Sequence, residues 1–183
     1  MKKKIYVNAP ITLCFALIGF VVLILGIATN GASTMKFFAT YPSSWKRPLT
    51  YVRLVTHIFG HSGISHYAGN MVYILLLGPI LEEKYHEKLI WVILLTALVT
   101  GLIHNFFFHG ALMGSSGICF AFILLASVTG RQKGVPLTLI LVALFWIGNE
   151  IYTGLTVHDQ ISQITHIIGG VCGGMTGLFL KDN

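Results

Sequence analysis

Charged residues are scarce in this chain. Lysine, arginine, aspartate and glutamate together make up 10% of its 183 residues, whereas soluble domains average about 25%. The net charge of +6 is spread along the sequence, and no basic cluster suited to a nucleic acid is present. Hydrophobic residues account for 55% of the chain. This composition predicts an integral membrane protein with no nucleic-acid partner.

Cysteine is also scarce, and its spacing carries no pattern. Cys14, Cys119 and Cys172 are scattered, and each falls in an apolar stretch. Disulfide frameworks and zinc sites need recurring cysteine spacings, so we expect these thiols to behave as small apolar side chains. We therefore expect neither a metal centre nor a cofactor.

Long apolar stretches take up most of the length. A helix needs about 20 apolar residues to cross a bilayer, so six such stretches predict an all-α, polytopic membrane protein with six transmembrane helices. The stretches are 11–28, 67–81, 89–108, 116–129, 135–151 and 161–180. One substantial loop, about 30–65, remains outside them. We expect residues 1–183 to form a single membrane domain in contact with the lipid bilayer.

The basic residues are divided unevenly between the two sets of loops. Under the positive-inside rule, this bias predicts that the N-terminus and the C-terminus both lie in the cytoplasm. The residues on the expected cytoplasmic side are Lys2, Lys3, Lys4, Lys84, Lys88, Arg131, Lys133 and Lys181, and those on the outer side are Lys36, Lys46, Arg47 and Arg53. The first apolar stretch follows three lysines, as in a signal peptide, but its length favours a retained helix.

A serine and a histidine stand at matched depths in two of the expected spans. Ser116 lies fifteen residues before Arg131, and His166 lies fifteen residues before Lys181. At 1.5 Å per residue, both side chains stand about 22 Å above the same membrane face. Polar groups are costly in hydrocarbon, so they should face each other or water. A serine beside a histidine suggests a nucleophile and its base.

A third span brings two more polar groups to this level. His66 and Asn70 lie sixteen and twelve residues before Glu82, and their spacing places them on one helical face. They bracket the depth of Ser116, where the start of a helix would present unpaired backbone N–H groups. Side-chain donors and N–H groups of this kind can stabilise an oxyanion.

Glycines accompany both polar residues. Gly114 and Gly117 flank the serine pair and allow a tight turn. Gly169 and Gly173 follow His166 on its helix and form a small face that favours close helix packing. No carboxylate lies at this depth, so the arrangement suggests a Ser-His dyad without an acidic third member.

In order and spacing, these residues resemble the rhomboid family of intramembrane serine proteases. The resemblance rests on His57-x3-His61-x4-His66-x3-Asn70, Gly78-x3-Glu82, Gly114-Ser115-Ser116-Gly117 and His166-x2-Gly169-x3-Gly173. It extends from the long loop to the last helix. The compact form is similar to the basic bacterial type, which implies a multi-pass protein of the plasma membrane with an active site that opens outward.

The resemblance also implies a role for each matched residue. Ser116 would be the nucleophile, His166 the general base, and His66, Asn70 and the Ser116 N–H the oxyanion hole. Supporting roles would fall to Arg53, His57 and His61 in the first loop, Glu82 near the cytoplasm, Gly114 and Gly117 at the turn, and Gly169 and Gly173 between helices. Substrates would be single-span membrane proteins, cut near the outer face.

Two positions depart from the family pattern. Phe120 stands where the family often has a tyrosine stacked on the catalytic imidazole, so a stacking face is kept and a hydroxyl is lost. Val52 precedes Arg53 where a tryptophan is often found, so an interfacial contact is missing. Neither change touches the dyad.

Two other interpretations remain open. A rhomboid-like protein could bind membrane helices without cutting them. Alternatively, a small transporter or metal carrier could use His57, His61 and His66, of which the first two lie one helical turn apart. No cysteine or acidic residue lies near these histidines in the sequence, and no paired repeats are visible.

Overall fold

The protein is a bundle of helices. The structure, a computed structural model, describes residues 6–129, 135–156 and 160–180. Within these ranges every regular element is a helix, and each expected apolar stretch overlaps one of the longer helices. These are α1 (Pro10–Ala28), α4 (Ile64–Tyr85), α5 (Lys88–Phe107), α6 (Ser116–Val128), α7 (Leu137–Thr156) and α8 (Gln160–Phe179). In the described part of the chain, α1, α4 and α5 are long and apolar enough to cross a membrane, and α6 is a shorter apolar helix.

Two helices extend further than their apolar stretches predicted. The apolar stretch that was expected to end at residue 81 continues as helix, because α4 extends to Tyr85 and buries Leu81 and Tyr85 completely. The stretch that was expected to end at residue 151 also continues as helix, because α7 extends to Thr156. In α4 the residues that end the hydrophobic stretch, Glu82, Glu83 and Lys84, are good helix formers, so they do not end the helix.

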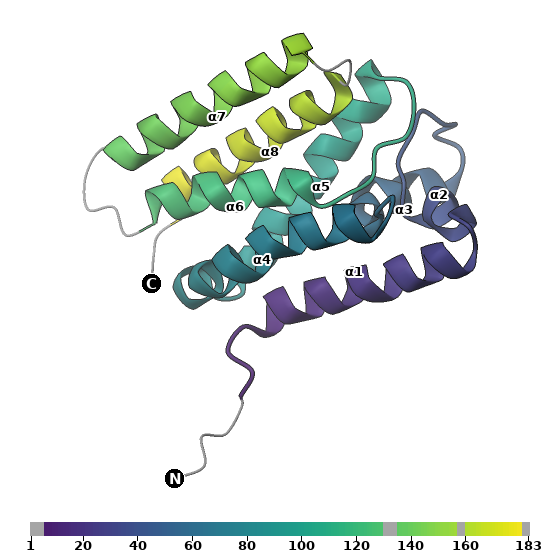
Figure 1. The fold of residues 1–183 in the computed structure, drawn as a ribbon, viewed down its shortest axis with the longest axis horizontal. Coiled ribbons are helices and arrows are strands. Elements are labelled where there is room, and N and C mark those ends of the chain that lie inside the picture. The colour runs from purple at the N-terminus through teal and green to yellow at the C-terminus, as the bar shows by residue number, and fades with distance from the viewer. Residues whose placement is uncertain (1–5, 130–134, 157–159, 181–183) are drawn as a thin grey trace.

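Several cations used for the topology prediction cannot be placed. Lys2, Lys3, Lys4, Arg131, Lys133 and Lys181 lie outside the described residues. The described helices still have a clear arrangement, in which α8 lies between α6 and α7, and α4 separates α6 from α1 (Figure 1). Helix α1 begins, and α8 ends, at the same end of the bundle.

The long loop after α1 is ordered by its own short helices. It contains α2 (Ala32–Phe37), α3 (Pro48–Thr56) and a 3-10 turn, η1 (His57–Phe59), at the opposite end of the bundle. Arg53 is buried in this loop: its guanidinium lies 4.2 Å from the centre of the Tyr41 ring and donates to Ser43 Oγ at 3.1 Å. An arginine in this position holds two parts of the loop together.

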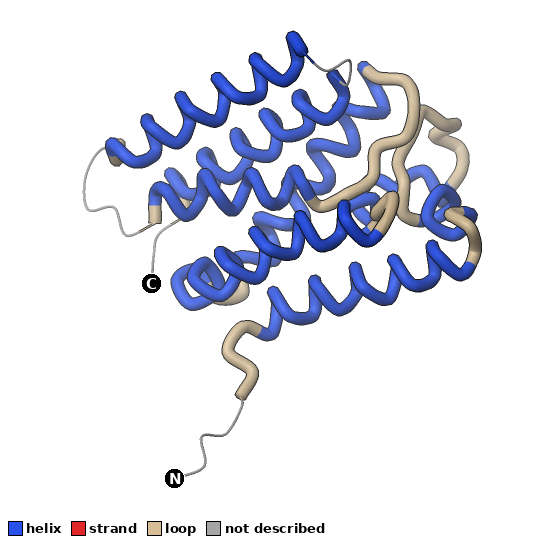
Figure 2. Tube along the Cα trace, in the orientation of Figure 1, coloured by secondary structure: helices blue, strands red, loops and turns tan. Residues whose placement is uncertain are grey.

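A short backbone pairing joins this loop to the segment before α6. Thr40 N donates to Leu112 O at 2.9 Å, and Leu112 N donates to Thr40 O at 2.8 Å. Figure 2 shows the two segments as neighbouring tan tubes beside the helix ends. The pairing fixes the path of the chain just before Gly114.

Glycines bring α6 and α8 into backbone contact. A Cβ atom built on Gly169 would collide with the carbonyl oxygen of Gly117, and one built on Gly173 would collide with that of Ala121. Helices without a hydrophobic driving force between them associate through such small faces. This contact sets the height of His166 relative to α6.

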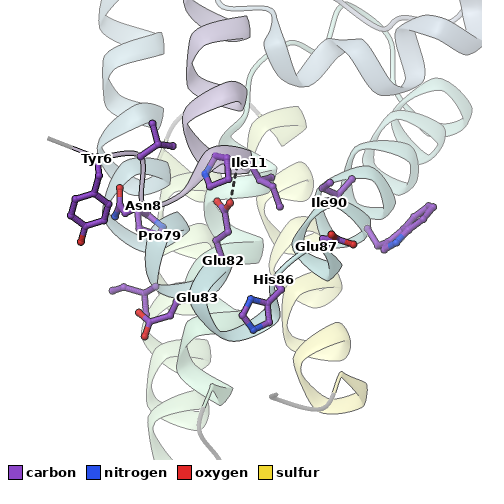
Figure 3. Close-up of a pocket in the computed structure, with 13 residues that line it drawn as sticks. Tyr6, Asn8, Ile11, Pro79, Glu82, Glu83, His86, Glu87 and Ile90 are labelled. Atoms are coloured by element: carbon purple, nitrogen blue, oxygen red, sulfur yellow. Dashed lines mark hydrogen bonds between the residues drawn. The ribbon is translucent and has the colours of Figure 1, made fainter. Parts of the chain in front are cut away.

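Glu82 holds the start of α1. Its carboxylate accepts hydrogen bonds from Ile11 N at 2.8 Å, Thr12 N at 2.9 Å and Thr12 Oγ1 at 2.8 Å (Figure 3). The residue before α1, Ala9, provides no side-chain cap, so the carboxylate from α4 satisfies the first N–H groups and complements the helix dipole. Gly78 permits this approach, because a Cβ there would lie 2.5 Å from Thr12 Cγ2.

We predict that Gly173→Ala destabilises the protein, because the added methyl group must push α8 away from α6. Overpacking of this kind typically costs about 1–3 kcal/mol. The matched control is Gly148→Ala on α7, where a Cβ would have no neighbour within 4 Å among the described atoms. Thermal unfolding in detergent micelles measures both variants. Equal melting temperatures for the two would contradict the close α6–α8 packing.

Candidate active site

The two serines of the turn before α6 have different environments. Ser115 is fully buried, and its Oγ lies 3.3 Å from His61 Nε2. Ser116 is the first residue of α6 and is partly exposed. Gly114 adopts φ +122°, a region that favours glycine, and its N–H donates to His57 O at 3.0 Å. The turn therefore holds Ser115 inside and leaves Ser116 with the unpaired N–H groups of a helix start.

His66 and Asn70 reach this turn from α4. A Cβ built on Gly114 would lie 2.8 Å from His66 Nε2 and 3.7 Å from Asn70 Nδ2. Asn70 is buried, and its Nδ2 has no hydrogen-bond partner among the described residues. A buried amide donor without a partner is rare, because it loses its hydrogen bonds to water and gains no hydrogen bond within the protein. The amide can therefore donate a hydrogen bond on the side of the turn at Gly114.

The tautomer of His66 follows from its neighbours. The backbone N–H of Ser62 donates to His66 Nδ1 at 3.5 Å, and Ser62 Oγ lies 3.1 Å from the same atom. A backbone N–H can only donate, so Nδ1 is an acceptor and the proton of the neutral ring is on Nε2. The N–H of His66 thus faces the same turn as the Asn70 amide.

His166 approaches α6 from α8. Its ring lies 4.4 Å, centre to centre, from that of Phe120, with the planes inclined at 37°. Phe120 is four residues after Ser116, so both lie on one side of α6. Thr165, the residue before His166, also lies close to α6, because its Cγ2 would be 3.6 Å from a Cβ built on Gly117. His66 is also near enough to His166 for the two rings to interact electrostatically.

Two more histidines support the turn from the first loop. His57 is buried, with Nε2 3.1 Å from Ala97 O, and His61 has Nδ1 3.1 Å from Phe59 O. Burial lowers the pKa of His57 to about 4, although its bond to Ala97 opposes the shift. Burial lowers the pKa of His61 to about 4, with a smaller contribution from the repulsion between the two rings when both His61 and His66 are protonated. Both rings are therefore neutral at pH 7.

These histidines do not gather around a common point. His57 Nε2 and His61 Nδ1 face carbonyl groups and His61 Nε2 faces a hydroxyl, and within the part of the chain that the structure describes no three metal-ligating side chains come together. The described arrangement offers no geometry for the metal-carrier interpretation.

Sequence reasoning missed three residues that shape the site. Ser115 entered the sequence analysis only as part of the matched motif, yet it is a buried partner of His61. No role was predicted for His104, but it is buried, and its Nε2 lies 3.2 Å from Gly110 O in the segment before the turn. Cys119, expected to behave as a small apolar side chain, contacts Asn70. Contacts made in the folded chain reveal these roles, because nothing in the local pattern distinguishes the three residues.

The Rhomboid domain model matches residues 48–183 of the chain. The chain belongs to the rhomboid family. It is similar to rhomboid protease GlpG of Salmonella paratyphi A (strain ATCC 9150 / SARB42), 27% identical over 144 residues that cover 75% of this chain and 52% of that protein. It is also similar to rhomboid-related protein 1 of Caenorhabditis elegans, 29% identical over 139 residues that cover 69% of this chain and 38% of that protein.

Membership of the rhomboid family identifies this chain as a polytopic membrane protein. The chain spans about half the length of the GlpG relatives that it matches. The matched region includes α3 to α8 and every residue of the candidate site, whereas α1 and α2 precede it.

We predict that this rhomboid loses stability as the pH falls from about 6.5 to about 4. His57 and His61 take up protons near pH 6.5 when unfolded but only near pH 4 when folded. The unfolded state therefore binds more protons in this window, and their contribution to stability is complete above pH 6.5. Melting temperatures between pH 5 and 8 test this.

The control variant for the pH profile is His57→Gln, which keeps an amide donor for Ala97 O but does not titrate. Its melting temperature should depend less steeply on pH between 5 and 6.5. An unchanged slope would show that His57 is not protonated on unfolding.

Proposed function

We propose that this rhomboid is an intramembrane serine endopeptidase with Ser116 as the nucleophile and His166 as the general base. The proposal rests on the contact between α6 and α8. Gly117 and Gly169 meet there, and the His166 ring stacks near Phe120 on the side of α6 that carries Ser116. A serine at this position needs a base within reach, and a neighbouring imidazole is the usual one.

The oxyanion hole is formed by His66, Asn70 and the backbone N–H of Ser116. Support comes from the two α4 side chains that face Gly114 and from the unsatisfied Nδ2 of Asn70. When Ser116 Oγ attacks a peptide carbonyl, its proton passes to His166, and the carbonyl oxygen becomes negative. Donors already aimed at that oxygen lower the barrier without reorganising. His166 then returns the proton to the leaving amine.

The fold supports a topology of six spans with both termini in the cytoplasm. The start of α1 and the end of α8 share one end of the bundle, and the ordered first loop lies at the other (Figure 1). Ser116 begins α6 near the first loop. The peptidase would therefore cut single-span membrane proteins near the outer face of a bacterial plasma membrane. It would need neither a metal nor a cofactor.

Replacement of the nucleophile tests the activity. Ser116→Ala should reduce cleavage of a single-span substrate in proteoliposomes by about 10⁴-fold or more, and it should abolish labelling by a fluorophosphonate. Mass spectrometry of the products locates the cut. The control is Ser115→Ala, which should lose stability with its His61 contact but keep labelling. Undiminished cleavage by Ser116→Ala would remove Ser116 from the mechanism, and no cleavage by the wild type would favour a non-catalytic role.

Replacement of the proposed donor tests the oxyanion hole. Asn70→Ala should lower kcat by about 10²-fold with little change in KM, because the amide acts on the transition state. The matched control is Asn105→Ala on α5, whose side-chain amide bonds Thr40 Oγ1 and Gly101 O instead. Equal effects of the two variants on kcat would indicate general damage rather than loss of a donor.

A further inference from the structure

A thiol of α6 contacts the amide of Asn70. Cys119 is 3% exposed, and its Sγ lies 3.7 Å from Asn70 Oδ1 and 3.4 Å from Asn70 O. Both acceptors belong to the residue whose Nδ2 faces Gly114. A thiol is a weak donor with a single proton, which these two oxygens share.

This contact selects one orientation of the amide. The two ends of an asparagine side chain are nearly equal in shape, so packing alone does not distinguish Oδ1 from Nδ2. With Oδ1 beside the thiol, an acceptor meets a donor, and Nδ2 points toward the turn. In the reversed orientation, an N–H donor would meet the sulfur, which is only a weak acceptor, and Oδ1 would face the place where an oxyanion forms.

We propose that Cys119 is a positioning residue of the reaction, since its S–H holds Asn70 Oδ1 and thereby presents Nδ2 to the oxyanion. The inference rests on the proposed function. Cys119 acts through Asn70, which its Sγ contacts, and is not itself a donor of the oxyanion hole. It lies three residues after Ser116, so the helix that carries the nucleophile also orients one donor of the oxyanion hole.

An apolar side chain of similar size would not serve this purpose. It would fill the space beside Asn70 but leave Oδ1 without the thiol donor, and the amide would then sample both orientations. The chain provides its own comparison in Cys172 of α8, which is also buried but whose thiol interacts with Thr96. Replacement of Cys172 by alanine should therefore not change the orientation of the Asn70 amide.

The experiment compares the single variants Cys119→Ala, Cys119→Ser, Cys172→Ala and Asn70→Ala with the double variant Asn70→Ala/Cys119→Ala in proteoliposomes. We expect Cys119→Ala to lower kcat by about tenfold, less than the loss of a whole donor, with KM within twofold. Cys119→Ser keeps a donor and should stay within about threefold of the wild type. Cys172→Ala should not change kcat. In the Asn70→Ala background, Cys119→Ala should add less than about twofold, since coupled residues are not additive.

Three results would overturn the inference: wild-type kcat in Cys119→Ala, equal losses in Cys119→Ala and Cys119→Ser, or a full further loss in the double variant. Equal losses of kcat and of melting temperature in Cys119→Ala and Cys172→Ala would overturn it as well, because they would indicate a general loss of stability.

A spectroscopic measurement separates this inference from the proposed function. The side-chain amide resonances of Asn70, assigned by their absence in Asn70→Ala, should form one sharp pair in the wild type and in Cys119→Ser. They should broaden or double in Cys119→Ala. This pattern without Ser116-dependent cleavage would contradict the peptidase but support the role of the thiol in orienting Asn70. Identical resonances in all three proteins would overturn that role, whatever the activity.

Discussion

The arrangement of this rhomboid depends on the backbone contact between α6 and α8. Gly117 and Ala121 on one helix meet Gly169 and Gly173 on the other so closely that no Cβ fits between them at the two α8 glycines. In a membrane, lipid competes with apolar side chains as a packing partner, so close approach of backbones supplies the attraction instead. The same contact fixes the depth of His166, because a helix cannot slide past interlocked glycines. Structural packing and the height of the proposed base are therefore one constraint.

A second constraint acts on the turn before α6. The segment is held by the Thr40–Leu112 pairing, by the bond from Gly114 N to His57 O, and by the burial of Ser115 against His61. His57 and His61, which are neutral, help to fix this segment through their hydrogen bonds. Because both nitrogens of His61 have partners, the ring connects loop and turn in one orientation. The turn that carries Ser116 is thus held by contacts within the protein.

The positions of the long helices could largely be predicted from the sequence. The apolar stretches indicated the long helices. The shared level of Ser116 and His166, inferred from regular helical rise over fifteen residues to the next cations, stays a prediction, because both cations lie outside the described residues and α6 ends at Val128. The predicted ends of α4 and α7 were wrong, because the hydrophobic pattern ends before the helix does. The short helices of the first loop and the partner of Asn70 were also missed. They depend on contacts across tens of residues, such as that of Cys119 with α4, which leave no local periodicity.

The attachment of α1 has a consequence for how its sequence can vary. Two of the three hydrogen bonds that Glu82 accepts come from the main chain of Ile11 and Thr12. All amino acids but proline have a main-chain N–H donor. These two hydrogen bonds to Glu82 therefore depend on the presence of a helix start and hardly on which side chains it carries. Along the rest of α1, many large apolar side chains are exposed, where lipid accepts any of them. The exposed positions of this first helix can therefore vary among hydrophobic residues over evolutionary time while its docking stays unchanged, provided that Gly78, the carboxylate of Glu82 and the buried face of α1 persist.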